Sequence, residues 1–139
     1  MVLERKKLIG EIGEDIAFDY EYKRLKSQSS KFEIDHISKK ICNSGYDIHS
    51  LTQKGKRLIE ERYIEVKSTT QSNNEIFLTE NKKNTLRELG KSAYIYLVQI
   101  TSVEKKQGYV LKEKENPINY FETKKILTPI VYKVKIEEN

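Results

Sequence analysis

The chain has 139 residues, of which 37% are hydrophobic and 34% charged, a composition typical of a globular protein rather than a fibre or a disordered segment. No apolar run approaches the roughly 20 residues that span a bilayer, and the N-terminus has no run of signal-peptide length, so we expect a cytoplasmic protein outside the membrane. The single cysteine, Cys42, excludes an internal disulfide and a cysteine-rich zinc site, and the net charge of +5 is compatible with a polyanionic partner.

The first part of the chain predicts a long helix over residues 3–26. Its apolar side chains recur at three- and four-residue spacing and so share one face: Ile9, Ile12, Ile16 and Tyr20. Gly10 and Gly13 weaken helix propensity, which indicates that another backbone or a ligand comes close to this helix. Three strands are predicted next, over residues 32–37, 46–51 and 57–68, with turns at residues 42–45 and 53–56.

The second part of the chain predicts another helix and further strands. Residues 69–74 are polar and loop-like, and Thr79 has the chemistry of an N-cap for a helix over residues 80–89, which Gly90 closes. The nearly continuous apolar run 93–100 predicts a strand buried on both faces, and weaker strands are predicted at residues 108–112 and 130–136. This order of elements predicts a mixed α/β fold, with helices packed on a sheet, in one domain over residues 1–139.

Charged residues on the second and third predicted strands are arranged to meet. Glu65 and Lys67 are two residues apart and share one face of the third strand, while Asp47 and His49 share one face of the second. If Asp47 pairs with Glu65, the hairpin is centred on residue 56, beside the expected turn at Gly55. Two carboxylates and one ammonium group then converge on one small patch.

Such a patch has a chemical interpretation and a simpler alternative. Two adjacent carboxylates repel each other unless a cation lies between them, and Mg²⁺ or Mn²⁺ would provide that cation with oxygen ligands. Lys67 could then orient or activate an attacking water, which is the chemistry of phosphodiester hydrolysis. The alternative is that Glu65 and Lys67 are two solvated strand residues and that Asp47 belongs to a turn.

The segments Gly-Tyr-Asp-Ile at residues 45–48 and Ile-Glu-Val-Lys-Ser-Thr at residues 64–69 resemble the signature of the PD-(D/E)XK, or restriction-endonuclease-like, nuclease superfamily. More closely, the chain resembles the nuclease-like domain at the C-terminus of NO VEIN-type proteins. That resemblance includes Gly13-Glu14 in the first helix, Leu-Thr-Glu-Asn at residues 78–81 and the tyrosine-rich strand 94–98, and it covers roughly residues 9–100. It implies a restriction-endonuclease-like core.

The resemblance also implies roles for individual residues. Asp47 and Glu65 would be metal ligands, with Val66 as a further metal contact, and Lys67 would be the catalytic lysine. Glu14 would reach the site as an additional carboxylate, although a solvated helix face is an equal alternative for it. The chain departs from the family pattern at position 82, where the family often has Glu and this chain has Lys, and at Tyr46.

Basic and hydroxyl side chains around this patch are candidate contacts to a phosphate backbone. They are Ser68, Thr69, Thr79, Lys54, Lys56, Arg57, Lys82, Lys83 and Arg87. For each lysine the alternative is a solvated surface, and for Thr79 it is a helix cap.

The resulting hypothesis is a Mg²⁺-dependent DNA endonuclease of a defence, restriction or repair system, which leaves a 5′-phosphate. Proteins that this chain resembles often form homodimers or belong to larger restriction, defence or helicase assemblies, so the resemblance implies such partners for this chain. A catalytically silent nucleic-acid-binding or interaction module and a branched-DNA resolvase remain open as alternatives. No base-reading motif is present, so the sequence assigns no base specificity.

Overall fold

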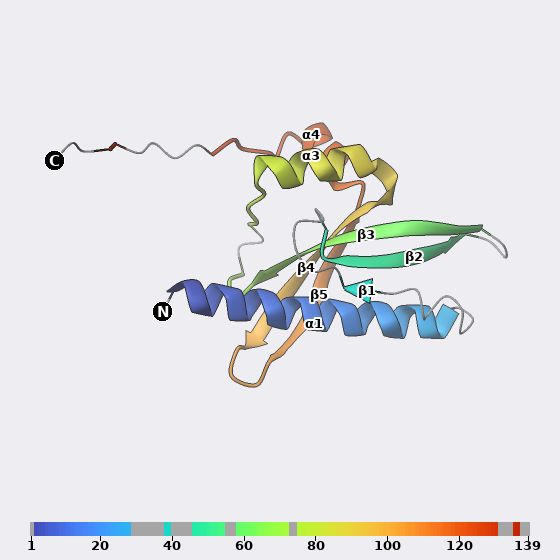
Figure 1. The fold of residues 1–139 in the computed structure, drawn as a ribbon, viewed down its shortest axis with the longest axis horizontal. Helices are drawn as coiled ribbons and strands as arrows, with labels where there is room; N and C mark the ends of the chain where they lie inside the picture. The colour runs from blue at the N-terminus through green and yellow to red at the C-terminus, as the bar shows by residue number, and fades with distance from the viewer. Residues whose placement is uncertain are drawn as a thin grey trace.

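The computed structural model describes residues 2–28, 38–39, 46–54, 58–72, 75–130 and 135–136 (Figure 1). The helices are α1 (Val2–Gln28), α3 (Glu80–Leu89), the short 3₁₀ helix η1 (Gly90–Ser92) and α4 (Pro117–Thr123). The strands are β1 (Ser38–Lys39), β2 (Ile48–Lys54), β3 (Leu58–Thr69), β4 (Ala93–Ser102) and β5 (Gln107–Glu115). No helix in the described part of the chain is long and apolar enough to cross a bilayer.

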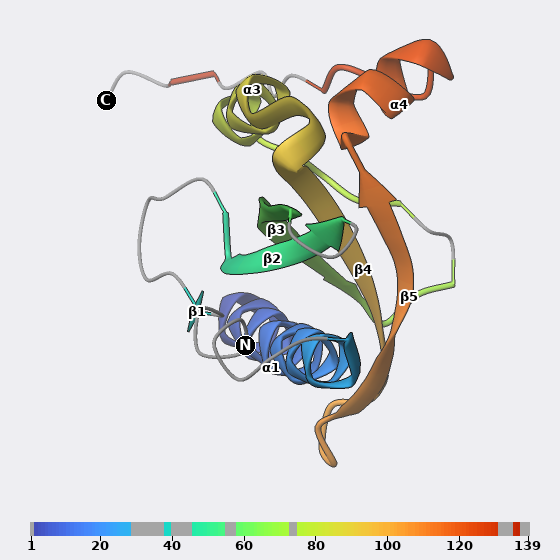
Figure 2. The ribbon, with the colours of Figure 1, turned by 90° about the vertical axis from the view of Figure 1, so that its right-hand side faces the viewer.

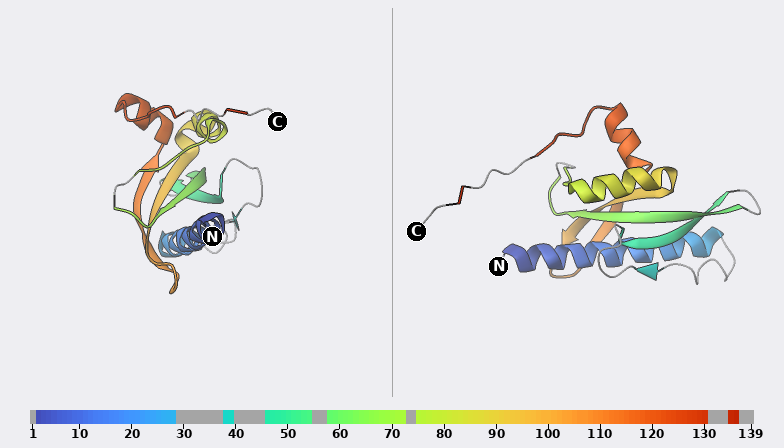
Figure 3. Two further views of the ribbon diagram at one scale, coloured as in Figure 1. Left: turned by 90° about the vertical axis from the view of Figure 1, so that its left-hand side faces the viewer. Right: turned by 45° about the horizontal axis from the view of Figure 1, so that its top comes forward.

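The strands form one mixed sheet in the order β1-β2-β3-β4-β5. β3 and β4 run parallel and are joined through α3, and the other neighbouring pairs are antiparallel. Helix α1 lies along one face of the sheet, and α3 and α4 lie on the other side, as the two views in Figure 2 and Figure 3 show. The predicted mixed α/β fold, with a restriction-endonuclease-like arrangement of its elements, is confirmed.

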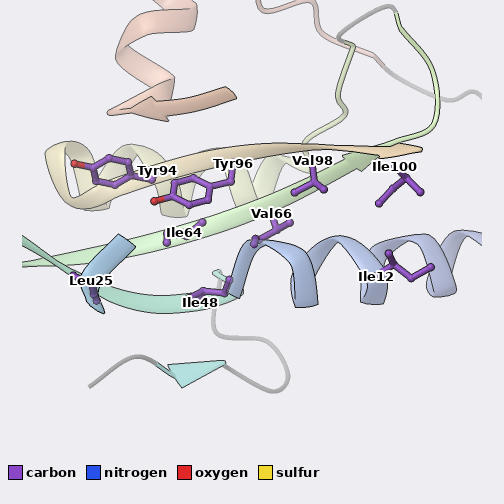
Figure 4. Packing of buried hydrophobic residues seen from close by; sticks show 10 residues of the cluster. Ile12, Leu25, Ile48, Ile64, Val66, Tyr94, Tyr96, Val98 and Ile100 are labelled. Carbon is purple, nitrogen blue, oxygen red and sulfur yellow. The ribbon is translucent and has the colours of Figure 1, made fainter. Parts of the chain in front are cut away.

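Burial on both faces of the sheet explains the apolar pattern of β4. Tyr94, Tyr96 and Val98 belong to the core beneath α1 (Figure 4). They pack there with residues of α1, β2 and β3: Ile12, Ala17, Leu25, Ile48, Ile64 and Val66. Ala93 and Ile95, which point to the other face, pack with Leu86 of α3 and Ile118 of α4. The predicted doubly buried strand is therefore confirmed.

The local capping signals of α3 are also confirmed. Thr79 has an extended backbone, and its Oγ1 accepts a hydrogen bond from the backbone N–H of Lys82 at 3.1 Å. Gly90 has a φ of +56°, a conformation that glycine adopts without strain, and its N–H bonds back to the carbonyl of Leu86. The helix consequently has the predicted bounds.

Some predicted elements differ from the structure or lie outside its described part. The strand expected at residues 32–37, the turn at 42–45 and the centre of the hairpin turn at 55–57 are outside the described residues. Ile130, Lys135 and Ile136 are exposed and belong to no strand, so the strand expected at residues 130–136 is wrong at these positions. Helix α4 was not predicted, because it has only seven residues and its main signal is Pro117 at its start.

The prediction of a close approach at α1 is confirmed at one of the two glycines. A Cβ atom on Gly13 would lie 1.6 Å from Oγ and 2.8 Å from Cβ of Ser68, so the helix backbone rests directly on β3. A Cβ atom on Gly10 would meet nothing within 4 Å. The contact between Gly13 and Ser68 fixes how closely the first turns of α1 approach the sheet.

Candidate functional site

The candidate site is built on β3, where charged and apolar side chains alternate. Ile64 and Val66 enter the core beneath α1, so Glu65 and Lys67 project from the opposite face of the sheet, towards α3. Glu65 is buried, with 2% of its surface exposed, and Lys67 Nζ lies 3.5 Å from Glu65 Oε2. Because side chains alternate between the two faces of a strand, the buried carboxylate of Glu65 and the ammonium group of Lys67 lie on the same face.

The predicted register brings Asp47 beside Glu65. Ile48 pairs with Ile64 and His49 with Tyr63, which is the register in which Asp47 comes opposite Glu65. β2 begins at Ile48, and just before it the Asp47 carboxylate Oδ2 accepts a hydrogen bond of 2.7 Å from the backbone N–H of Val66. β3 continues past the start of β2, and there the Asp47 side chain accepts the hydrogen bond that a backbone carbonyl would accept if β2 were longer at its N-terminal end.

The electrostatics of Glu65 reflect this crowding. Burial raises the pKa of Glu65, and repulsion from the Asp47 carboxylate raises it further. The hydrogen bond and positive charge of Lys82, together with the charge of Lys67, oppose both effects, but the pKa stays above its ordinary value. A buried carboxylate with a second, half-buried carboxylate beside it is stabilised by nearby positive charge.

Lys82 provides much of that charge. Its Nζ lies 2.8 Å from Glu65 Oε1, so the two oxygens of Glu65 face two different ammonium groups. Burial alone would lower the pKa of Lys82, but the hydrogen bond to Glu65 and the charges of Glu65, Asp47 and Glu14 raise it. The sequence placed Lys82 only among the phosphate contacts. A lysine in the first turn of a helix, where the dipole disfavours a cation, is the signal that indicates an acidic partner.

Glu14 lies on α1, which packs on the other face of the sheet. It is half-buried and follows Gly13, whose contact with Ser68 brings this part of α1 against β3. Its negative charge adds to those of Glu65 and Asp47 in raising the pKa of Lys82. The direct partner of Lys82 is Glu65, and Glu14 acts on it through its charge.

The remaining hydroxyl candidates have structural partners or lie elsewhere. Ser68 Oγ is buried against Gly13, on the face opposite Glu65, and has no hydrogen-bond partner among the described residues. Thr69 Oγ1 accepts a hydrogen bond from the backbone N–H of Gln71, and Thr79 caps α3. Thr69 and Thr79 therefore have structural roles, and Ser68 lies on the other face of β3 from Glu65.

The remaining basic candidates are not gathered at the site either. Lys83 pairs with Glu80 at 3.4 Å, and Arg87 pairs with Glu122 at 2.9 Å. The side chain of Lys54 and all of Lys56 and Arg57 are outside the described residues. His49 is hydrogen-bonded to Glu61.

The donor set suits a hard divalent cation that keeps open positions. Mg²⁺ is usually bound through one or two carboxylates, several waters and the phosphates of a substrate, and Asp47 and Glu65 provide the two carboxylates. The N–H of Val66 points to the edge of β3 at Asp47, before the start of β2, and in a strand the carbonyl of the same residue points the same way, so this oxygen is a third candidate ligand. Among the described residues, no three His, Cys, Asp or Glu side chains lie close enough together to hold an ion by themselves.

Comparison with known families gives a match over most of the chain. The sequence model of the family described as Protein NO VEIN, C-terminal, matches residues 13–111, a span that contains Glu14, Asp47, Glu65, Lys67 and Lys82. The chain belongs to this family. No curated protein and no solved structure shows a significant match.

A second polar cluster of this NO VEIN C-terminal domain lies beneath α1 and was not predicted. Glu21 has no exposed surface and accepts hydrogen bonds from Arg24 at 2.9 and 2.7 Å, from Ser50 Oγ at 2.6 Å and from the hydroxyl of Tyr96. Burial would raise the pKa of Glu21, but Arg24, helped by Ser50 and Tyr96, lowers it below its ordinary value. Nη1 of Arg62, on β3, lies 3.6 Å from Oε1 of Glu21. The cluster therefore ties α1 to β2, β3 and β4.

The signal for Glu21 was present in the sequence. Positions 13, 17, 21 and 25 follow one another at four-residue spacing and are all buried. Three of them are small or apolar, and Glu21 interrupts the series as a charged residue on a core-facing stripe. Such a residue requires partners, which here come from three strands and from Arg24 on its own helix.

Proposed function

We propose that this NO VEIN C-terminal domain is a metal-dependent nuclease that hydrolyses phosphodiester bonds of DNA with Mg²⁺ or Mn²⁺. The observation that carries the proposal is the convergence of Asp47 and Glu65 with the ammonium groups of Lys67 and Lys82 on β3, beside the start of β2. A core-packing role does not require two carboxylates to be held against each other. A phosphate-binding role alone does not require carboxylates beside a polyanion.

Each side chain has a separate task in this proposal. Asp47 and Glu65, with the carbonyl of Val66, would hold a divalent ion, and the bound ion would supply Lewis acidity and a water of lowered pKa. Lys67, whose Nζ is 3.5 Å from Glu65 Oε2, donates hydrogen bonds to the attacking water and to the phosphate oxygen on which charge develops. Glu65 orients Lys67 and thereby keeps its ammonium group on the reacting side of the strand.

The test is nicking of supercoiled plasmid in Mg²⁺ or Mn²⁺, compared with the same reaction in EDTA. Wild-type protein is expected to nick only with metal, and Lys67→Ala and Asp47→Ala are each expected to lose about 100-fold or more in rate. Lys83→Ala is the matched control, because Lys83 pairs with Glu80 and stands outside the carboxylate cluster. The proposal fails if wild type does not cut with either metal, or if both site variants cut like wild type.

A second candidate function is a non-catalytic nucleic-acid-binding module. The observation that favours it is the Lys82–Glu65 ion pair of 2.8 Å, which neutralises a carboxylate that the nuclease needs as a ligand. A binding module is expected to retain duplex DNA in EDTA, to show no cleavage with metal and to bind equally well after Asp47→Ala.

A panel of linear duplex, single-stranded DNA, RNA and four-way junction substrates separates a general nuclease from a branched-DNA resolvase. End-labelling of the products tests for the expected 5′-phosphate.

A further inference from the structure

Lys82 occupies an unusual position for a helix lysine. It stands in the first turn of α3, where the backbone dipole disfavours a positive charge, and its side chain is only one-third exposed. Its Nζ lies 2.8 Å from Glu65 Oε1, across the gap between α3 and β3. The ammonium group is therefore held in place by Glu65 rather than by its own helix.

The charges of the cluster explain why a cation is required there. The cluster contains two carboxylates, on Asp47 and Glu65, and two ammonium groups, on Lys67 and Lys82. Without Lys82, two negative charges would face one positive charge around a Glu65 side chain that is 3% exposed. In a medium of low dielectric constant such an imbalance is costly, and either protonation or another cation must relieve it.

The contact of Lys82 also competes with metal ligation. Its Nζ lies at 2.8 Å from Glu65 Oε1, and this is an oxygen that a divalent ion would need, while Lys67 faces the other oxygen at 3.5 Å. Lysine has a flexible four-carbon stem and a strongly hydrated ammonium group, so it can leave the carboxylate without movement of α3. A substrate phosphate beside Asp47 and Glu65 would offer the released ammonium group a new partner.

We propose that Lys82 is a tethered counter-cation of the carboxylate cluster and that a divalent ion binds by displacing its ammonium group from Glu65. This inference rests on the proposed function, since it concerns the same carboxylates. Lys82 neutralises the buried Glu65 carboxylate beside Asp47 before metal arrives and weakens the binding of metal when no nucleic acid is present. A bound phosphate takes up the displaced ammonium group, so substrate and metal bind cooperatively.

The experiment is a calorimetric titration with Mn²⁺ in the absence of nucleic acid, which needs no catalytic readout. Lys82→Met and Lys82→Gln are each expected to bind Mn²⁺ about tenfold more tightly than wild type, a difference of about 1.4 kcal/mol. Lys83→Met, on the next residue of α3, is the control and is expected to stay within about twofold of wild type. Equal or weaker binding in both Lys82 variants overturns the inference.

Two further readouts separate the possible failures. Lys82→Met leaves Glu65 without one of its cations and lowers stability, so the rise in melting temperature caused by Mn²⁺ is measured for each variant against its own EDTA sample. This rise is expected to be larger in both Lys82 variants than in wild type. If wild type binds Mn²⁺ and nicks plasmid while the Lys82 variants bind no more tightly, only the counter-cation role is refuted. If no variant binds Mn²⁺, both the counter-cation role and the nuclease are refuted.

Discussion

Glu21 provides the most direct test of how α1 is held on the sheet. Glu21→Gln keeps the shape of the side chain but removes its charge, so Arg24 loses its carboxylate partner and Arg62 loses a nearby negative charge. Removing one member of a buried ion pair costs about 3–5 kcal/mol, and glutamine retains one acceptor oxygen for Ser50 or Tyr96. We therefore expect a loss of about 3 kcal/mol in the free energy of unfolding, equivalent to a fall of about 10 °C in melting temperature for a chain of this size.

The assay is urea unfolding followed by circular dichroism, with Asp19→Asn as the control. Asp19 forms an exposed pair with Lys23 on the same helix, with side-chain exposures of 62% and 74%, and its loss is expected to cost less than about 0.5 kcal/mol. A Glu21→Gln protein as stable as Asp19→Asn would refute the reasoning, because it would mean that the negative charge of Glu21 beside Arg24 and Arg62 contributes nothing net to stability.

Three further predictions follow from the contacts described. Because the pKa of Glu21 is lowered on folding, its stabilisation is complete above the ordinary glutamate pKa of about 4.3 and is lost as pH falls through the lower folded value, so the difference between wild type and Glu21→Gln should shrink in acid unfolding curves. Gly13→Ala should lower stability by about 1–3 kcal/mol, since its Cβ collides with Ser68, whereas Gly10→Ala should be neutral or raise stability by up to about 1 kcal/mol; the same urea titration checks both. Lys67→Ala should bind Mn²⁺ within about threefold of wild type in calorimetry while it loses about 100-fold in nicking; parallel losses of both would contradict its assignment to the reacting groups.

The sequence predicted those features that depend on neighbours close in the chain. Helix 80–89 has the expected bounds because its cap, Thr79, and its terminator, Gly90, are local signals. The register that brings Asp47 to Glu65 follows from the two-residue period of strands and from a turn centred on residue 56. β4 was found because an apolar run of that length suits a strand covered by helices on both faces.

What the sequence did not predict depends on packing between distant segments. Lys82 meets Glu65 only because α3 lies over β3 after the chain has turned back on itself, and this placement is set by the apolar contacts of Leu86 and Ile118. The burial of Glu21 depends on partners from three strands, of which Tyr96 is 75 positions away. Periodicity indicates which face of an element is buried, but it does not indicate which polar groups will meet there.

The parallel pairing of β3 with β4 has a consequence for the order of folding. β2 and β3 are joined by a short hairpin connection. The pairing of β3 with β4, for example of Tyr63 with Ala93, instead requires a long connection that includes the whole of α3. Short loops close at lower entropic cost and sooner than long ones, so the hairpin is expected to form first. Asp47 and Glu65 then meet with Lys67 beside them but before Lys82 has arrived as the second cation. Early folding of this chain therefore proceeds against electrostatic resistance, which added salt or mild acid should relieve.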